Sequence, residues 1–342
     1  MNRASFARWR NLLLGLLIST IFLWLALRDL DWSAVGAVLQ NARWGYLLPV
    51  FAVWTAGLAV RAVRWRVLLG DRVGLGSAFH ILNIGFLINN VLPFRVGDLA
   101  RAYLVARDEA PVSGWAALST VVTERILDML CVVLLLAAVL PVLPVDPAVA
   151  TGGLALGGIA LGGFTLLLLF AHRPARVQAW AERLLGLLPA HLRARLIGLL
   201  VRMLDGLRPL TTWRGLWGAA LWTAAGWFCT LFAAWLLGLV FPDLPATDVV
   251  RAALTLAVVA ASFSFIIPFT LANVGPFEAA SIFALMAAAV PQELAAAYAV
   301  VWHTTVVPLY ALWGAVGLLA LGLSLGQVRR GAASLAEPTP GD

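Results

Sequence analysis

Long apolar stretches separated by short polar segments dominate the chain. A helix needs about 20 residues to cross a hydrocarbon core of about 30 Å, with a usable range of roughly 17–25 residues or slightly more when tilted. Six stretches are long enough without a clear break: residues 11–27, 44–60, 115–140, 148–171, 215–241 and 294–326. The pattern therefore predicts an all-α polytopic membrane protein with about six transmembrane helices.

Two further apolar stretches, residues 77–107 and 248–290, are broken near their centres. The breaks are Leu92-Pro93-Phe94 with Gly97-Asp98, and Ile267-Pro268-Phe269 with Gly275-Pro276-Phe277-Glu278. Proline is favoured at the first position of a helix, so we expect a new helix to begin at Pro93. A helix from Pro93 to Arg107 would reach only about 20 Å. Both stretches therefore predict re-entrant helical hairpins.

The two broken stretches occupy matching places in the chain. A full span precedes and follows each of them, which defines repeat 1 at about residues 44–140 and repeat 2 at about residues 215–326. Counting the spans, the first hairpin enters from the cytoplasm and the second from outside. Paired broken helices in an inverted repeat are typical of secondary transporters, whose sites lie near the midplane. We expect one integral membrane domain over residues 1–330.

The composition excludes a soluble domain. Hydrophobic residues make up 62% of the chain and charged residues 12%, and the mean hydropathy is +0.92. All 24 basic residues are arginine. They lie between apolar spans and form no contiguous basic surface in the sequence, so we expect no nucleic acid partner.

The arginines also orient the chain. With the N-terminus in the cytoplasm, nineteen arginines lie inside and three, Arg28, Arg43 and Arg251, lie outside, while Arg95 and Arg125 stay at membrane depth. Because cytoplasmic segments carry the excess of basic residues, we expect both termini in the cytoplasm. The expected location is the cytoplasmic (inner) membrane of a prokaryote. The count is the same for hairpins and for pairs of full spans.

Residues 172–214 differ from the spans around them. Eight arginines alternate there with leucines, too frequently for the segment to cross the membrane. A basic amphipathic segment usually lies on the membrane surface, so we expect a cytoplasmic linker in contact with anionic lipid headgroups. Residues 331–342, with two prolines, are expected to form a disordered tail.

Charged residues mark the first break. Arg95, Asp98 and Arg101 are spaced i, i+3 and i+6, roughly on one helix face. Charges at membrane depth are costly and usually mark a pathway or a site. The alternative is a cytoplasmic loop in which the three charges are simply solvated.

The next span carries three charges within about one turn: Glu124, Arg125 and Asp128. We expect Arg125 to pair with Glu124 or Asp128 on its own helix, or with Asp98 of the hairpin, because pairing lowers the cost of burial. With these groups, the candidate substrate-binding residues are Asn89, Asn90, Arg95, Asp98, Arg101, Glu124, Arg125, Asp128, Asn273, Glu278 and His303.

A phosphate-binding cavity follows from these positions. A half-helix that begins inside the membrane directs free N–H groups to the interior, and the guanidinium of Arg95 suits a phosphate. We expect Arg95, the helix start at Pro93 and the segment near Gly275 to line one midplane cavity. Glu278 would repel a phosphate when ionised, so it is a candidate for protonation on loading or for contact with a cationic part of the headgroup. His303 is interpreted either as a structural hydrogen-bonding residue or as a proton relay.

Enzyme signatures are absent from the sequence. It contains no nucleotide-binding loop, no metal-ligand spacing and no nucleophile–base pair. Cys131 and Cys229 both lie in apolar segments, as small buried residues do. We therefore expect no catalytic residue, no metal and no cofactor.

Three runs carry a resemblance to a known family. They are Asn-Asn-x-Leu-Pro-Phe-Arg-x-Gly-Asp (89–98), Thr-Val-Val-x-Glu-Arg-x-x-Asp (120–128) and Gly-Pro-Phe-Glu (275–278). The chain resembles, over roughly residues 10 to 328, the membrane family named after the flippase region of lysylphosphatidylglycerol synthases. The resemblance implies a translocator that stands alone, since no synthase domain fits in the twelve residues after Arg330.

The chain departs from that family pattern in two places. Residues 270–274 replace a Pro-Gly-Gly-x-Gly-type turn, and His303 stands where an arginine is common. Three functions remain open: a translocator of a polar- or anionic-headed lipid, a membrane enzyme acting on a lipid headgroup, and a small-solute transporter or assembly partner. A cavity open laterally to lipid would favour the first. Because no ATP motif is present, transport would use an ion gradient, the membrane potential or a downhill path.

Overall fold

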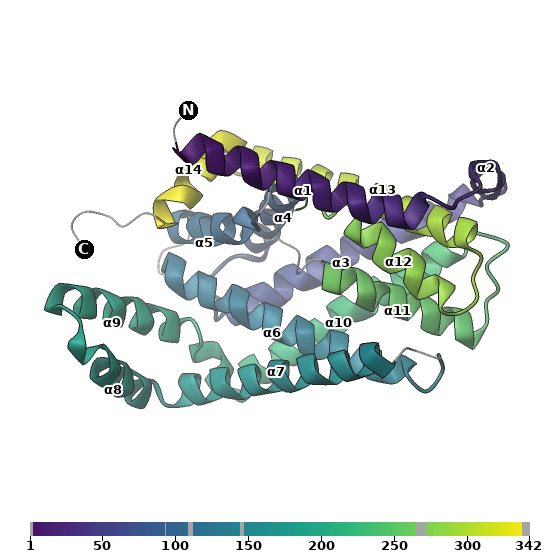
Figure 1. Ribbon diagram of the computed structural model, residues 1–342. Helices are drawn as coiled ribbons and strands as arrows, with labels where there is room; N and C mark the ends of the chain where they lie inside the picture. Colours follow the sequence, from purple (N-terminus) through teal and green to yellow (C-terminus); the bar gives the residue numbers. More distant parts are fainter. Residues whose placement is uncertain are drawn as a thin grey trace.

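The computed structural model describes residues 3–92, 94–108, 112–143, 147–264, 270 and 272–336, which form helices and turns with no strand among them. Figure 1 shows the long helices side by side in one bundle. In chain order the helices are α1 (Arg3–Leu27), α2 (Trp32–Gln40), α3 (Leu47–Leu68), α4 (Leu75–Val91), α5 (Val96–Asp108), α6 (Gly114–Val139), α7 (Pro147–His172), α8 (Pro174–Leu184), α9 (Ala190–Asp205), α10 (Trp213–Gly238), α11 (Asp248–Ser264), α12 (Pro276–Met286), α13 (Gln292–Ala320) and α14 (Leu325–Ala336), with the 3-10 turns η1 (Trp44–Tyr46), η2 (Leu185–Leu187) and η3 (Arg208–Thr211).

Several of these helices qualify as membrane spans by length and composition. Within the described residues there are four, Trp44–Leu68, Thr151–His172, Trp213–Gly238 and Gln292–Ala320, or five if Leu13–Leu27 and Trp32–Gln40, bent by 82°, count as one. The predicted span over residues 115–140 corresponds to α6. With 26 residues, α6 is about 39 Å long at 1.5 Å per residue, but its three central charges set it apart from the apolar spans.

The first broken stretch forms two short helices, α4 and α5, that pack against each other. The break falls where the sequence predicts it, but Pro93 lies outside the described residues and α5 begins at Val96. The two helices meet at glycine: a Cβ added to Gly97 would lie 2.0 Å from the Gly85 carbonyl oxygen. This contact leaves no room for a side chain at Gly97.

The second broken stretch forms α11 and α12, which also pack against each other. Residues 265–269 and 271, and with them the expected break at 267–269, lie outside the described part of the chain. Gly275 precedes α12 with a φ of 97°, and a Cβ there would lie 2.5 Å from the Ser19 carbonyl oxygen of α1. A left-handed φ and a close backbone approach both require glycine at this position.

Glycine contacts also give the directions of the long helices. Gly57 of α3 faces Cys229 of α10, and Gly218 of α10 faces Val67 of α3, so these two helices run antiparallel. Helix α13 likewise packs antiparallel against α4, and α11 packs against α6. The pairs α4–α5 and α11–α12 lie toward opposite ends of the bundle, the first beside the N-terminus and the second toward α2 (Figure 1).

Two apolar cores occupy the two ends of the bundle. One surrounds the first helix pair and includes the second half of α3, the start of α6 and α14. The other surrounds α11 and α12 and includes the first half of α3 and the second halves of α6 and α10. The middle of α3 and α6 therefore lies between two apolar cores, and this is where the charged residues lie.

Two expected boundaries are wrong. The second span was expected to end at residue 60, with Arg61 and Arg64 in a cytoplasmic loop, but α3 continues to Leu68 because both arginines find polar partners inside the bundle. The last span ends at Ala320 and not at residue 326.

The expected disordered tail is also wrong as far as Ala336. Helix α14 includes residues 325–336 and packs on α5, with Val328 and Ala332 fully buried. A Cβ on Gly331 would lie 2.1 Å from the Tyr103 ring. Burial of these small apolar residues against α5 explains why the segment forms a helix although its composition is largely polar. Residues 337–342 lie outside the described residues.

The glycine contact between α4 and α5 can be tested by adding one methyl group. Gly97→Ala should lower the free energy of unfolding by about 1–3 kcal/mol, because the Cβ overlaps the Gly85 carbonyl oxygen. Thermal unfolding in detergent measures this loss. Gly158→Ala on α7, where nothing lies within 4 Å of the new methyl, should leave the midpoint unchanged. Equal midpoints for both variants would contradict the contact.

Candidate functional site

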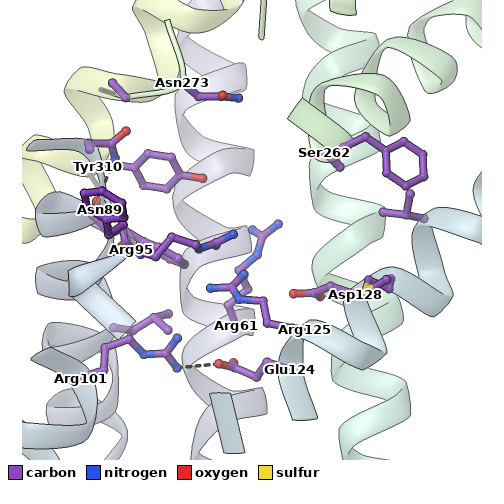
Figure 2. A pocket seen from close by; sticks show the side chains of 18 of the residues that line it. Arg61, Asn89, Arg95, Arg101, Glu124, Arg125, Asp128, Ser262, Asn273 and Tyr310 are labelled. Carbon is purple, nitrogen blue, oxygen red and sulfur yellow. Dashed lines mark hydrogen bonds and ion pairs between the residues drawn. The ribbon is translucent and has the colours of Figure 1, made fainter. Parts of the chain in front are cut away.

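One cavity of about 320 Å³ lies between the two broken helix pairs. A volume of this size is typical of a site for a small ligand or a headgroup. Its lining comes from α3, α4, α5, α6, α10, α11 and α13 and from two turns. The first turn, before α5, contributes Leu92, Phe94 and Arg95, and the second turn, before α12, contributes Thr270, Ala272 and Asn273. The helices contribute Arg61, Arg64, Leu82, Phe86, Asn89, Asn90, Arg101, Glu124, Arg125, Asp128, Met129, Val132, Trp227, Ser262, Phe263 and Tyr310. Figure 2 shows Arg101 and Glu124 at one end of the cavity and Asn273 at the other.

A buried ion network forms the floor of the cavity. The Glu124 carboxylate accepts from Arg64, with Nη2 at 3.2 Å, and from Arg101, with Nη2 at 2.7 Å. Arg64 also donates to Asp128, whose Oδ1 lies 2.6 Å from Nη1. The guanidinium of Arg101 stacks 4.2 Å from the ring centroid of Trp65. Such contacts offset the cost of placing charges away from water.

A second group of charges joins the first turn to α6. Arg125 Nη2 lies 3.1 Å from Asp98 Oδ1, and Arg95 Nε lies 3.5 Å from Asp98 Oδ2. Of the three partners predicted for Arg125, the structure shows the ion pair with Asp98 of α5. Asn89 holds the same turn, because its Oδ1 accepts from the Gly97 N–H at 2.8 Å and its Nδ2 donates to Asp98 at 3.3 Å.

The remaining polar walls of the cavity come from α3, α10, α13 and α4. Arg61 donates to the Thr230 hydroxyl of α10 at 2.7 Å. Trp227, also of α10, donates its ring N–H to Asp128 at 3.1 Å. Tyr310 of α13 lines the opposite side. Asn90 lines the cavity while its amide donates to the Phe86 carbonyl at 2.9 Å.

Both turns at the cavity contain two consecutive residues in the left-handed region. They are Phe94 and Arg95 in the first turn, with φ of 66° and 53°, and Ala272 and Asn273 in the second, with φ of 48° and 62°. Each such non-glycine residue costs roughly 1–2 kcal/mol, so the surrounding contacts must hold the turns in place. At Asn273, the amide donates to the Ser264 hydroxyl and the amide oxygen accepts from Thr270.

Glu278 and His303 lie behind the second turn and do not line the cavity as described. Glu278 accepts from the Gly275 N–H at 2.7 Å and meets His303 Nδ1, while His303 Nε2 donates to the Ala272 carbonyl oxygen at 2.9 Å. The Glu278 carboxylate is thus turned onto its own helix start, and its expected role toward the headgroup stays a prediction. The pair supports the turn that carries Asn273.

The structure thus brings most of the predicted residues together. Asn89, Asn90, Arg95, Arg101, Glu124, Arg125, Asp128 and Asn273 line the cavity, and Asp98 bonds to two of its arginines. The sequence analysis missed Arg61 and Arg64. Their spacing of three residues within a continuing apolar pattern, beside the buried Trp65 and Leu68, was the available signal that α3 continues through them.

The fold and the cavity define a multi-pass helical membrane protein with a charged site inside its bundle. The family model described as "Lysylphosphatidylglycerol synthase TM region" matches residues 12–314. The chain belongs to this family, as the resemblance in its three motifs implies. Comparison with curated proteins and with solved structures gives no match.

The shared carboxylate of the ion network makes a sharp stability test. Glu124→Gln removes the charge that Arg64 and Arg101 both contact, so two buried guanidinium groups lose a partner. We expect a loss of about 3–5 kcal/mol, measured by thermal or denaturant unfolding in detergent. Glu182→Gln on the exposed face of α8 should change stability by less than about 0.5 kcal/mol. A similar small effect at Glu124 would mean that water, not arginine, solvates its carboxylate.

Proposed function

We propose that the protein translocates a lipid with a polar or anionic headgroup between the leaflets of the membrane. The observation that carries the proposal is one cavity that joins five arginines to both broken helix pairs. A phosphate in hydrocarbon is prohibitively unfavourable. Fixed guanidinium groups replace much of the water that the headgroup loses on entering the membrane.

The rim of the cavity favours a lipid over a small solute. Phe94 lines the cavity and is 45% exposed, and Val91, three residues before it at the end of α4, is 48% exposed. Exposed apolar side chains beside a polar cavity suit an opening toward the bilayer, where acyl chains stay in hydrocarbon while the headgroup enters. A small-solute transporter needs a route closed to lipid.

The contacts of the acidic groups favour translocation over headgroup chemistry. An enzyme acting on the headgroup needs an acid or a base in contact with it. Glu124 and Asp128 accept from arginines, and both ring nitrogens of His303 are bonded behind the second turn. We therefore propose that these residues shape and support the site without a catalytic role.

We further propose that the bundle is an inverted repeat of α3–α6 and α10–α13, with α4–α5 and α11–α12 as re-entrant hairpins. Several observations support this. Helices α3 and α10, the first of each unit, run antiparallel. In such a repeat, α4 of the first unit corresponds to α11 of the second, and α6 corresponds to α13. The contact between α4 and α13 then corresponds to the contact between α11 and α6, and both contacts occur. Each turn also has two consecutive left-handed residues. Six full spans would then frame two hairpins.

The arm formed by α8, η2 and α9 suits the cytoplasmic membrane surface. Trp180, Leu184 and Leu187 are exposed, and arginines flank them along both helices. Apolar side chains beside basic ones match the interface and its anionic headgroups. We propose that this arm rests on the cytoplasmic leaflet of the inner membrane, at the same end of the bundle as the start of α1 and helix α14 (Figure 1).

Leaflet transfer in proteoliposomes tests the proposed function. The probes are fluorescent phosphatidylglycerol and fluorescent phosphatidic acid, and the readout is the fraction of probe that an impermeant quencher reaches over time. Arg95→Gln should slow transfer at least about tenfold, the effect of losing one charge-assisted hydrogen bond. Arg251→Gln, exposed at the base of α11, should transfer like the wild type. If lipid transfer in liposomes with the wild-type protein were no faster than in protein-free liposomes, translocation would be refuted.

Site-directed labelling tests the orientation. In a variant lacking Cys131 and Cys229, a cysteine replaces either Leu187 in η2 or Asp243 between α10 and α11, both exposed positions. Leu187→Cys should react with an impermeant maleimide only after the cells are opened, and Asp243→Cys should react in intact cells. Labelling of Leu187→Cys in intact cells would reverse the proposed topology.

A further inference from the structure

The charges around the cavity do not balance, and we propose that the imbalance selects the headgroup: the site takes a phosphate monoester that carries two negative charges. This inference rests on the proposed function, since it names the class of lipid that the same cavity takes. The shared chemistry is the terminal phosphate, whether a lipid or a soluble molecule carries it.

The count of ionised groups gives the imbalance. The cavity is lined by five arginines and two carboxylates, and Asp98 adds a third carboxylate through its contacts with Arg95 and Arg125. Among the described residues, five positive charges against three negative ones leave a formal charge of +2. Residues 93, 265–269 and 271, which lie outside the described part and adjoin the two turns in the sequence, are all uncharged.

The Glu278–His303 pair adds no net charge behind the second turn. The Ala272 carbonyl oxygen faces His303 Nε2, so that nitrogen carries a proton. The contact between Nδ1 and the Glu278 carboxyl also needs one proton, on either partner. Imidazolium with carboxylate and imidazole with carboxylic acid both sum to zero. The surplus of +2 therefore belongs to the cavity itself.

The surplus lies in the middle of the cavity, not in its floor. Arg64 and Arg101 are buried against Glu124 and Asp128. Arg61 instead donates to an uncharged hydroxyl, Thr230, and Arg95 shares Asp98 with Arg125. Figure 2 shows Arg61, Arg95 and Arg125 at the centre of the cavity, where guanidinium groups from α3, the first turn and α6 converge.

Headgroup classes differ in how well they neutralise this surplus. A phosphate monoester carries about −1.5 to −2 at pH 7 and offers three oxygens to the guanidinium groups. A phosphodiester such as phosphatidylglycerol carries one negative charge and leaves +1. A zwitterionic headgroup leaves +2, and lysyl-phosphatidylglycerol, with two ammonium groups and one phosphate, would raise it to +3. In the low dielectric between two apolar cores, the monoester is the matching class.

Competition between matched lipids tests the inference. Native mass spectrometry of the full-length protein in mixed micelles measures the bound ratio of phosphatidic acid to phosphatidylglycerol at equal concentration and with equal acyl chains. We expect the wild type to bind phosphatidic acid at least about tenfold better, as one extra charge-assisted hydrogen bond allows. Arg61→Gln lowers the surplus to +1, which phosphatidylglycerol alone neutralises, and should bring the ratio to one or below. Lysyl-phosphatidylglycerol should compete with neither lipid.

Controls separate the cavity from the protein surface. Arg208→Gln removes an exposed arginine of η3 and should keep the wild-type ratio. Arg95→Gln removes the same charge from the first turn and should reproduce the effect of Arg61→Gln, which covers the case in which Arg61→Gln fails to fold. A wild-type ratio near one, or a high ratio that persists in both cavity variants, would overturn the inference.

Two further arms identify the source of the phosphate and isolate the proposed function. Glycerol 3-phosphate displaces bound phosphatidic acid at comparable concentration if the site reads a soluble monoester, and fails to do so if it reads a lipid. Transfer of both fluorescent lipids at equal rates, with no binding preference, would leave translocation standing and remove the charge selection. Preferential binding of phosphatidic acid without any transfer would support the charge selection and refute translocation.

Discussion

The structure depends on burying charge inside an apolar bundle. A single ion between two apolar cores is strongly unfavourable, so each guanidinium and carboxylate needs partners from other helices. Glu124 on α6 joins Arg64 of α3 to Arg101 of α5, and Asp98 joins the first turn to Arg125 of α6. The same groups that form the cavity thus fix α3, α5 and α6 relative to one another. The site and the fold share one set of contacts, which ties any loosening of the cavity to the stability of the bundle.

Most of the architecture was predictable because hydropathy is a local property of sequence. The apolar stretches and the first break appear at the expected places, and three motifs were enough to indicate the family. The errors concern contacts between distant segments. Arg61 looked like a loop residue until Thr230, 169 residues away, supplied its partner. For His303 the sequence offered a structural hydrogen-bonding role but no partner, because Glu278 faces it only after α12 and α13 pack. Helix α14 looked like a polar tail because the surface that buries it belongs to α5.

The two turns show how a backbone conformation of high energy is kept at a site. Pairs of non-glycine residues stay left-handed at 94–95 and 272–273, where side chains from neighbouring segments hold them. Asn89 does this in the first turn, and in the second His303 bonds to the Ala272 carbonyl oxygen. Strained backbone of this kind persists where its surroundings determine it. Here it bends the chain sharply enough for Arg95 and Asn273 to reach the same cavity from opposite ends of the bundle.

Helix α1, early in the chain, packs against the second helix pair, and helix α14, late in the chain, packs against the first. Helix α1 lies against the start of α12, with the Ser19 backbone in contact at Gly275, and α14 lies against α5 at Tyr103. During synthesis, the cover of the second pair is made long before that pair emerges. The first pair must wait for its cover until α14 leaves the ribosome. The face of α5 that α14 buries therefore stays uncovered until more than 200 residues after α5 have been made, so this early helix pair completes its packing after the later one.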